Sequence, residues 1–208
     1  MISFRSRNIQ SWRTHDYCSI DVETTGLDLQ KDEVISVGAV LIVDGRFKGH
    51  GNFYEEIVPA RNPSPASIEV HGIRGMDLAS AQPAESVIPL LIDFMKDTQL
   101  IAHANWVEKA FLSHRMKKNG YKYPKRVIDT AALARYVGIA ENKNGYEPSL
   151  EVVARKLNLP VYSPHHALGD AMTTAAVFLA LASRIEAKIR VETGQELSLE
   201  RLHEISTR

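Results

Sequence analysis

The chain has 208 residues, 44% of them hydrophobic, and its 25 Lys and Arg are balanced by 25 Asp and Glu. A domain of this length buries enough apolar surface to fold without disulfides, and the single cysteine, Cys18, excludes an internal one. The longest apolar runs, 34–43 and 175–182, are shorter than the ~20 residues that cross a bilayer, and residues 1–16 lack the apolar core of a secretory signal. We therefore expect a cytoplasmic protein that does not enter a membrane.

The net charge of zero argues against a protein that coats duplex nucleic acid, because such proteins are usually basic. The charge is nevertheless unevenly distributed. Residues 1–14 hold three Arg and no acid, and residues 115–126 hold six Lys and Arg and no acid. Two interpretations of 115–126 stay open: a charged loop after a helix, or a surface for a phosphate backbone, on which Tyr121 and Tyr123 could stack against bases.

The first part of the chain predicts three consecutive antiparallel strands. Residues 17–23 form a buried strand ended by a Thr-Thr-Gly turn, 32–45 a longer β-branched strand closed by an Asp-Gly dipeptide, and 47–58 the returning strand. A Pro-rich loop over 58–67 then leads to a short helix around 67–71.

The rest of the chain alternates between helical and extended patterns, so we expect a mixed sheet with helices on its faces. The expected elements are a helix from Pro83, a strand over 99–104, a helix from Asn105 to about Lys117, a short strand over 126–130 that runs into a helix, a helix over 149–157 capped by Ser149, and a long final helix.

Ser163-Pro164 signals the start of that final helix, which would put His165 at or before its first turn and Asp170 in its second. The charged tail from about Glu186 is either a surface helix or without structure.

Acidic residues near the end of the first strand suggest a metal site. Asp21 and Glu23 are two positions apart, so strand alternation puts both on one face with Cα atoms about 7 Å apart. Such a pair could hold two cations about 4 Å apart, and its oxygen ligands favour Mg²⁺ or Mn²⁺. Asp170 would add a third carboxylate, with His165 or His166 beside it as a base. The other interpretation is solvated acids at a turn and at a helix N-terminus.

Four blocks of sequence, in this order and spacing, resemble the DEDDh exonucleases, the family of the epsilon subunit of DNA polymerase III. They are SIDVETTGL, AHANWVEKAFL, IDTAALAR and HHALGDA, joined by VHGI at 70–73. The first is similar to the family motif D-x-E-T-T-G-L/M and the last to H-x-A-x-x-D. The resemblance covers roughly residues 15–185, flanked by a basic N-terminal extension, 1–14, and a charged C-terminal tail, 186–208.

The resemblance implies an α/β, ribonuclease-H-like fold, with three antiparallel strands followed by parallel strands and flanked by helices. It also implies roles for individual residues. Two Mg²⁺ or Mn²⁺ ions would be held by four carboxylates, and His165, five places before Asp170, would be the general base that activates a metal-bound water. The implied metal ligands are Asp21, Glu23, Glu108 and Asp170, and the implied substrate contacts are Thr24, Leu27, His103 and Val107.

The second block departs from the family pattern H-N-A-x-F-D. Glu108 stands where the family has Asp, and Val107 where it has Phe. Val107 would give the base of the terminal nucleotide a smaller apolar surface to pack on than the family's Phe does. Asn105 and Glu108 are also spaced as a helix cap and its partner, so a capping role stays open. Asp129, before a predicted helix, is expected to be an N-cap.

The predicted function is a metal-dependent 3′-5′ exonuclease that releases 5′-nucleoside monophosphates from the 3′ end of single-stranded or frayed DNA. Two alternatives are an exoribonuclease that prefers RNA, and a catalytically impaired nucleic-acid-binding or scaffolding protein. A polymerase partner is left open.

Overall fold

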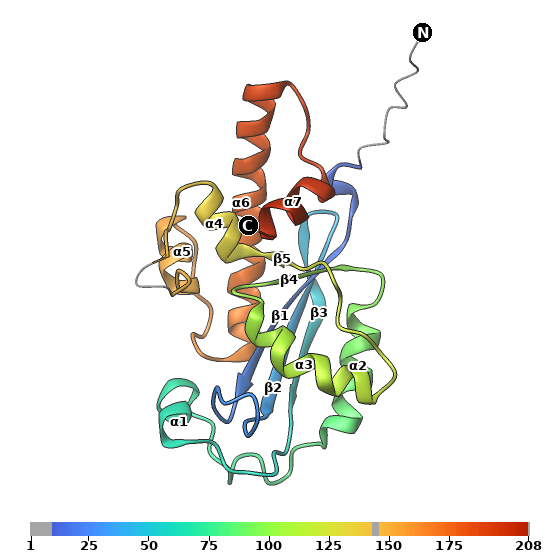
Figure 1. The fold of residues 1–208 in the computed structure, drawn as a ribbon, viewed down its shortest axis with the longest axis vertical. Helices are drawn as coiled ribbons and strands as arrows, with labels where there is room; N and C mark the ends of the chain where they lie inside the picture. Colours follow the sequence, from blue (N-terminus) through green and yellow to red (C-terminus); the bar gives the residue numbers. More distant parts are fainter. Residues whose placement is uncertain (1–9, 143–145, 208) are drawn as a thin grey trace.

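The fold is built on one mixed five-stranded sheet with the strand order β3-β2-β1-β4-β5 (Figure 1). The structure is a computed structural model that describes residues 10–142 and 146–207. The strands are β1 (Tyr17–Thr24), β2 (Val34–Val43), β3 (Arg46–Glu56), β4 (Gln99–Ala102) and β5 (Ile128–Asp129). β1, β2 and β3 pair antiparallel, and β4 and β5 continue the sheet parallel to β1. The predicted order of antiparallel and then parallel strands is confirmed.

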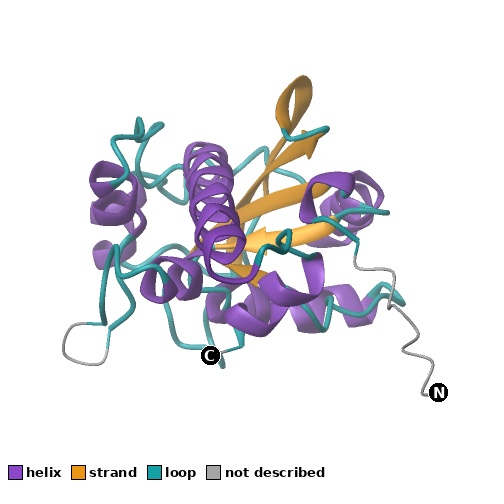
Figure 2. Ribbon diagram, turned by 90° about the horizontal axis from the view of Figure 1, so that it is seen from above, coloured by secondary structure: helices purple, strands orange, loops and turns teal. Residues whose placement is uncertain are grey.

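Helices lie on both sides of this sheet (Figure 2). After a 3₁₀ turn, η1 (Trp12–Thr14), they are α1 (Pro65–His71), α2 (Ala84–Met95), α3 (Trp106–Lys118), α4 (Thr130–Tyr136), α5 (Leu150–Lys156), α6 (Ala167–Thr193) and α7 (Leu199–Ser206). The two predicted caps are present: Ser149 accepts from Val152 N–H, and Asp129 accepts from Ala131 and Ala132 N–H.

The central strand β1 separates two apolar cores. Cys18, Ile20 and Val22 pack into the core that α2 and α3 cover, whereas Tyr17 belongs to the core formed with α4, α5, α6 and α7. Strand alternation therefore sends the intervening positions, including residues 21 and 23, toward the α6 side of the sheet. Burial on both faces explains why β2 is almost continuously apolar, whereas β1 carries Ser19, Asp21 and Glu23 among its apolar residues.

The long helix α6 begins later than the sequence predicts. Ser163 and His165 have φ angles of 31° and 59°, which a right-handed helix cannot contain, so the helix starts only after His166. Asp170 therefore lies in the first turn of α6, and the prediction that it lies in the second turn is wrong.

By length and composition α6 is also apolar enough to cross a membrane, with a mean hydropathy of 1.3 over its most apolar window. In the fold, 56% of that window is buried. Packing against β1 and β2 accounts for its apolar residues.

The charged C-terminal segment folds onto the rest of the molecule. α6 continues across residue 186, the predicted start of the tail, and α7 buries Leu202 and Ile205 in the core shared with α6. Glu186 also accepts hydrogen bonds from Trp12 Nε1 at 3.2 Å and Arg13 Nη2 at 2.6 Å. Of the predicted basic extension, residues 1–9 lie outside the described part of the chain.

Candidate active site

Three carboxylates meet at the end of β1. Asp21 and Glu23 project toward α6, whose first turn carries Asp170, and one oxygen of each residue lies within 4.8 Å of the other two. The grouping expected from the sequence for these three residues is therefore present.

The approach of α6 to β1 depends on a glycine in the neighbouring strand. Gly38 pairs with Asp21, and a Cβ at Gly38 would lie 2.2 Å from the backbone carbon of Ala167. Because real Cβ atoms do not come so close to backbone, any side chain at this position would push the start of α6 outward. Gly38 thus allows Asp170 to reach the other two acids.

Burial and mutual repulsion make these carboxylates hard to ionise. The pKa of Asp21 is raised well above its ordinary value, first by burial and then by the charges of Glu108, Glu23 and Asp170. Burial and the charge of Asp170 raise the pKa of Glu23 to about 7. Burial also raises the pKa of Asp170 to about 6. A divalent cation would relieve both the repulsion and the loss of solvation.

Glu108 stands next to this group but is not one of the three clustered acids. It is the third residue of α3 and is 2% exposed, and its Oε2 has no hydrogen-bond partner among the described residues. Burial raises its pKa to about 8, with the charges of Asp129 and Glu23 adding to the shift. A buried carboxylate oxygen without a partner is costly, so a ligand such as a cation would satisfy it.

The alternative capping role for Asn105 and Glu108 does not match the structure. Asn105 makes no side-chain cap bond. Its Oδ1 instead accepts a 2.6 Å hydrogen bond from the hydroxyl of Tyr123. Tyr123 is only 9% exposed, so the idea that it stacks on bases is wrong for this ring, whereas Tyr121 is 48% exposed.

His165 and His166 have different surroundings. The backbone N–H of His165 donates to Asp170 Oδ2 at 3.0 Å, and its exposed ring has Nε2 3.7 Å from Glu151 Oε1. His166 stacks on Tyr54, with ring centroids 4.5 Å apart. The ring of His165 is therefore exposed and near Glu151, while that of His166 is held against β3.

The residues expected to contact substrate lie around the same site. Leu27 is 64% exposed, whereas Thr24 is buried and its hydroxyl donates to the carbonyl of Gly26 at 2.7 Å. Val107 is half-buried against the core of α2 and α3. Leu27 is thus available to an incoming base, and Thr24 shapes the turn that presents it.

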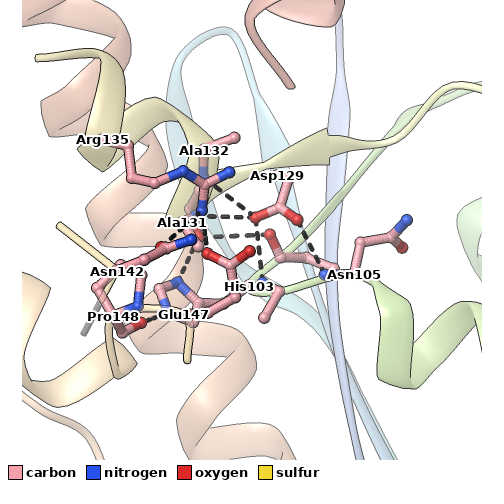
Figure 3. Close-up of polar contacts among 12 residues, drawn as sticks. His103, Asn105, Asp129, Ala131, Ala132, Arg135, Asn142, Glu147 and Pro148 are labelled. Atoms are coloured by element: carbon pink, nitrogen blue, oxygen red, sulfur yellow. Dashed lines mark hydrogen bonds and ion pairs between the residues drawn. The ribbon is translucent and has the colours of Figure 1, made fainter. Parts of the chain in front are cut away.

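His103 belongs to a network that fastens the loop before α5 (Figure 3). Its Nε2 lies 2.7 Å from the carbonyl oxygen of Pro148, and its Nδ1 lies 2.8 Å from Thr130 Oγ1. Arg135 forms an ion pair with Glu147 in the same loop. With both ring nitrogens engaged inside the protein, His103 joins the end of β4 to α4 and to the loop before α5, and its expected contact with substrate stays a prediction.

Asp129 holds the start of α3 in the same network (Figure 3). Besides capping α4, its two carboxylate oxygens accept from the N–H groups of Ala104 and Asn105, each at 3.1 Å. Sequence reasoning predicted the cap but not this second role, because it joins residues that are 24 and 25 positions apart.

His71, to which the sequence analysis assigned no chemistry, also borders the site. Its Nδ1 accepts from Ile73 N–H at 3.0 Å, so its Nε2 donates to the carbonyl oxygen of Thr24 at 3.2 Å. Its pKa is lowered mainly by burial and further by the charge of His165. The resemblance of the VHGI segment to the family was the one sequence feature that pointed to His71. In the structure, the hydrogen bond from His71 to Thr24 stabilises the turn after β1.

Comparison with known families covers most of the chain: residues 18–178 match the RNase T family model, which is described as an exonuclease. Two curated relatives are larger proteins. The chain is 34% identical over 196 residues to the PolC-type DNA polymerase III of Thermotoga petrophila, covering 94% of this chain and 13% of that protein. It is 32% identical over 188 residues to a DNA polymerase III subunit epsilon-like protein of Rhodobacter capsulatus, covering 88% of this chain and 26% of that protein. The chain thus spans about a quarter or less of the length of these relatives.

Solved structures share the fold. Exonuclease I of E. coli, in complex with a dT13 oligonucleotide, superposes with a TM-score of 0.71 over 85% of this chain and 43% of that chain, at 15% identity. The nuclease domain of 3′hExo, a DEDDh family member bound to rAMP, superposes with a TM-score of 0.68 over 91% of this chain and 98% of that chain, at 19% identity. The family match and the sequence relatives agree with this shared fold, and the chain belongs to the RNase T exonuclease family.

Proposed function

We propose that the chain is a metal-dependent exonuclease that removes nucleotides from the 3′ end of a nucleic acid strand and releases 5′-nucleoside monophosphates. One observation carries this proposal: oxygens of Asp21, Glu23 and Asp170 lie within 4.8 Å of one another, and Asp170 is hydrogen-bonded to the backbone of His165. The oligonucleotide bound to Exonuclease I and the rAMP bound to 3′hExo support a nucleic acid substrate.

The donor set fits two Mg²⁺ or Mn²⁺ ions. Asp21, Glu23 and Asp170 offer hard oxygen ligands at short separation, and the unpartnered Oε2 of Glu108 is a fourth donor at the same end of the sheet. When bound, such ions would polarise the terminal phosphodiester and stabilise the charge that develops on its oxygens.

The residues of the chain would then supply positioning and proton transfer. His165 would take the proton of the attacking water, and the hydrogen bond from its N–H to Asp170 keeps it beside the carboxylates. Leu27 and Val107 would contact the terminal base, Thr24 would hold the turn, and His103 would support the pocket wall.

For the substrate we favour the 3′ end of single-stranded or frayed DNA, with RNA as the second choice. Binding at a strand end needs few phosphate contacts, which suits a chain of zero net charge. We also propose a cytoplasmic location. A polymerase partner is compatible with the PolC-type and epsilon-like relatives.

The test is digestion of 5′-labelled DNA and RNA oligonucleotides of equal length with Mn²⁺, with chelator, and with two variants. Asp21→Asn and His165→Ala should each reduce the rate by about 100-fold or more, as loss of a metal ligand or a general base does. His166→Ala, which removes the stacked neighbour, should change it less than tenfold.

Unchanged digestion by Asp21→Asn would reject the assigned chemistry. An equal loss in His166→Ala would reject His165 as the base. Metal-independent binding without mononucleotide release would instead support the impaired binding protein. The ratio of the DNA and RNA rates identifies the preferred strand.

A further inference from the structure

A basic pocket of about 340 Å³ lies along α3 and the segment that follows it. Four lysines line it, and so do one exposed and one buried tyrosine, and no carboxylate of the described residues does. The basic pocket is defined here by Lys109, Lys117, Lys122, Lys125, Tyr121 and Tyr123.

The lysines of the basic pocket are not neutralised by the protein. None of the four forms an ion pair with a carboxylate within the described ranges 10–142 and 146–207. Two arginines nearby in sequence behave differently, because Arg115 pairs with Glu33 and Arg126 pairs with Glu200. Four unpaired cations around one concave surface repel one another, and an anionic ligand would relieve that repulsion.

The basic pocket is connected to the carboxylate site at two points. Lys109 directly follows Glu108 on α3, and the hydroxyl of Tyr123 donates to Asn105 at the start of the same helix. Lys117 lies nine residues beyond Glu108, about 13 Å at the helical rise. One side of the pocket is therefore formed by the helix that begins at the site, and the other by the segment that follows this helix.

The distance from the site sets the length of strand that reaches the pocket. An extended single strand is longer per nucleotide than the roughly 3.4 Å rise of a duplex, so the strand must continue past the nucleotide that is removed in order to reach Lys117. Lysine ammonium groups bind phosphates without reading sequence, and an exposed tyrosine ring such as Tyr121 stacks on any base.

We propose that the basic pocket binds the sugar-phosphate backbone of the substrate strand upstream of the nucleotide that is removed. The proposal rests on the proposed function. Lys117, Lys122 and Lys125 contact phosphates, and Tyr121 packs against a base. The occupant is a single nucleic acid strand, and its phosphates are the chemistry that DNA and RNA share.

The experiment compares oligonucleotide binding by the wild type with a triple variant, Lys117→Gln, Lys122→Gln and Lys125→Gln. All three side chains are exposed, so folding should be unaffected, and a thermal melt checks this. A second triple variant, Arg184→Gln, Lys188→Gln and Arg190→Gln on α6, makes the same change in net charge far along the other helix and is the matched control. Binding of labelled 20-mers is followed by fluorescence anisotropy, with Ca²⁺ in place of Mn²⁺ to keep the strand intact.

The expected result is a weaker salt dependence in the pocket variant alone. Loss of three phosphate contacts makes the negative slope of log K against log salt shallower by about 2. The ratio of wild-type to variant affinity therefore falls about 20-fold between 50 and 200 mM salt. Thymidine 5′-monophosphate, which has no upstream strand, should bind all three proteins alike. A difference seen with DNA 20-mers only, or with RNA 20-mers only, identifies the strand that the pocket takes.

Equal slopes in the wild type and both variants would overturn the proposal, and so would an equal decrease in both variants. Preferential binding of a polyglutamate peptide, with oligonucleotide affinity unchanged by the pocket variant, would assign the surface to an acidic protein segment instead. Hydrolysis of the p-nitrophenyl ester of thymidine 5′-monophosphate, which has no upstream strand, is measured separately. Absence of this hydrolysis in the wild type would count against the proposed exonuclease activity. The anisotropy measurement tests only whether the basic pocket binds the strand.

Discussion

Carboxylate residues at the end of β1 are held together against their own repulsion. Burial and neighbouring charges raise the pKa of Glu23 to about 7, that of Asp170 to about 6 and that of Glu108 to about 8. Without a cation, ionising these groups costs free energy in the folded state that the unfolded chain does not incur. The site is therefore arranged for a bound cation rather than for the stability of the metal-free protein.

This leads to a prediction for Glu23→Gln in the metal-free protein. A carboxyl whose pKa is raised by folding stabilises the protein below its unfolded pKa, near 4.3, and this contribution is lost as the pH rises through the folded pKa of about 7. Wild type and Glu23→Gln should thus be equally stable at pH 4, and the variant should be more stable by roughly 3 kcal/mol at pH 8. Urea unfolding at both pH values, with chelator present, measures the difference.

Saturating Mn²⁺ should reverse this order at pH 8, because the cation binds the wild type better and stabilises only the folded state. A metal-free variant less stable than the wild type at pH 8 would show that Glu23 is not strained by its neighbours.

Among the elements, the contact between β2 and the start of α6 decides whether the site can form. Gly38 leaves room for the backbone of Ala167 and Leu168, each 2.2 Å from where a Cβ would be. Gly38→Ala should therefore displace the first turn of α6 together with Asp170, lower stability by about 1–3 kcal/mol, and weaken Mn²⁺ binding. Isothermal titration calorimetry with Mn²⁺ reports the second effect.

The matched control for Gly38→Ala is Val40→Ala, two positions along the same strand. Val40 is 1% exposed, so its truncation also destabilises the protein but leaves a cavity instead of a clash. Mn²⁺ affinity should stay near that of the wild type in Val40→Ala. If both variants bound Mn²⁺ equally well, the close approach of α6 at Gly38 would not be what positions Asp170.

For the molecule as a whole, the C-terminal segment completes the core on the α6 side of the sheet. Leu197, Leu202 and Ile205 are fully or almost fully buried there, and Leu199 N–H bonds to the carbonyl of Gln10 at 3.3 Å. The two ends of the described chain therefore close the same core. This arrangement argues that the segment after residue 186 contributes to folding stability.

Leu202→Ala should accordingly destabilise the protein by about 2–5 kcal/mol, as other buried leucine truncations do. Val191→Ala, at a position on α6 that is 88% exposed, is the control and should change stability by less than about 0.5 kcal/mol. Thermal and urea unfolding measure both. Similar stabilities for the two variants would mean that α7 is not part of the cooperative core.

The sequence by itself determined the features that depend on local periodicity and local hydrogen bonding. Strand alternation puts Asp21 and Glu23 on one face, and Ser149 and Asp129 cap the helices that follow them. The order of apolar runs predicts the mixed sheet. These features were predictable because neighbouring residues alone fix a strand face or satisfy the first N–H groups of a helix.

Only the tertiary structure decided what depends on contacts between distant segments. Backbone angles at Ser163 and His165 delay α6, Gly38 lets that helix reach β1, and Tyr123 is buried against Asn105. The burial of Glu108 and the docking of α7 are of the same kind. Each depends on how surfaces far apart in the chain fit together, and single-residue patterns carry no information about that fit because packing is a property of both partners.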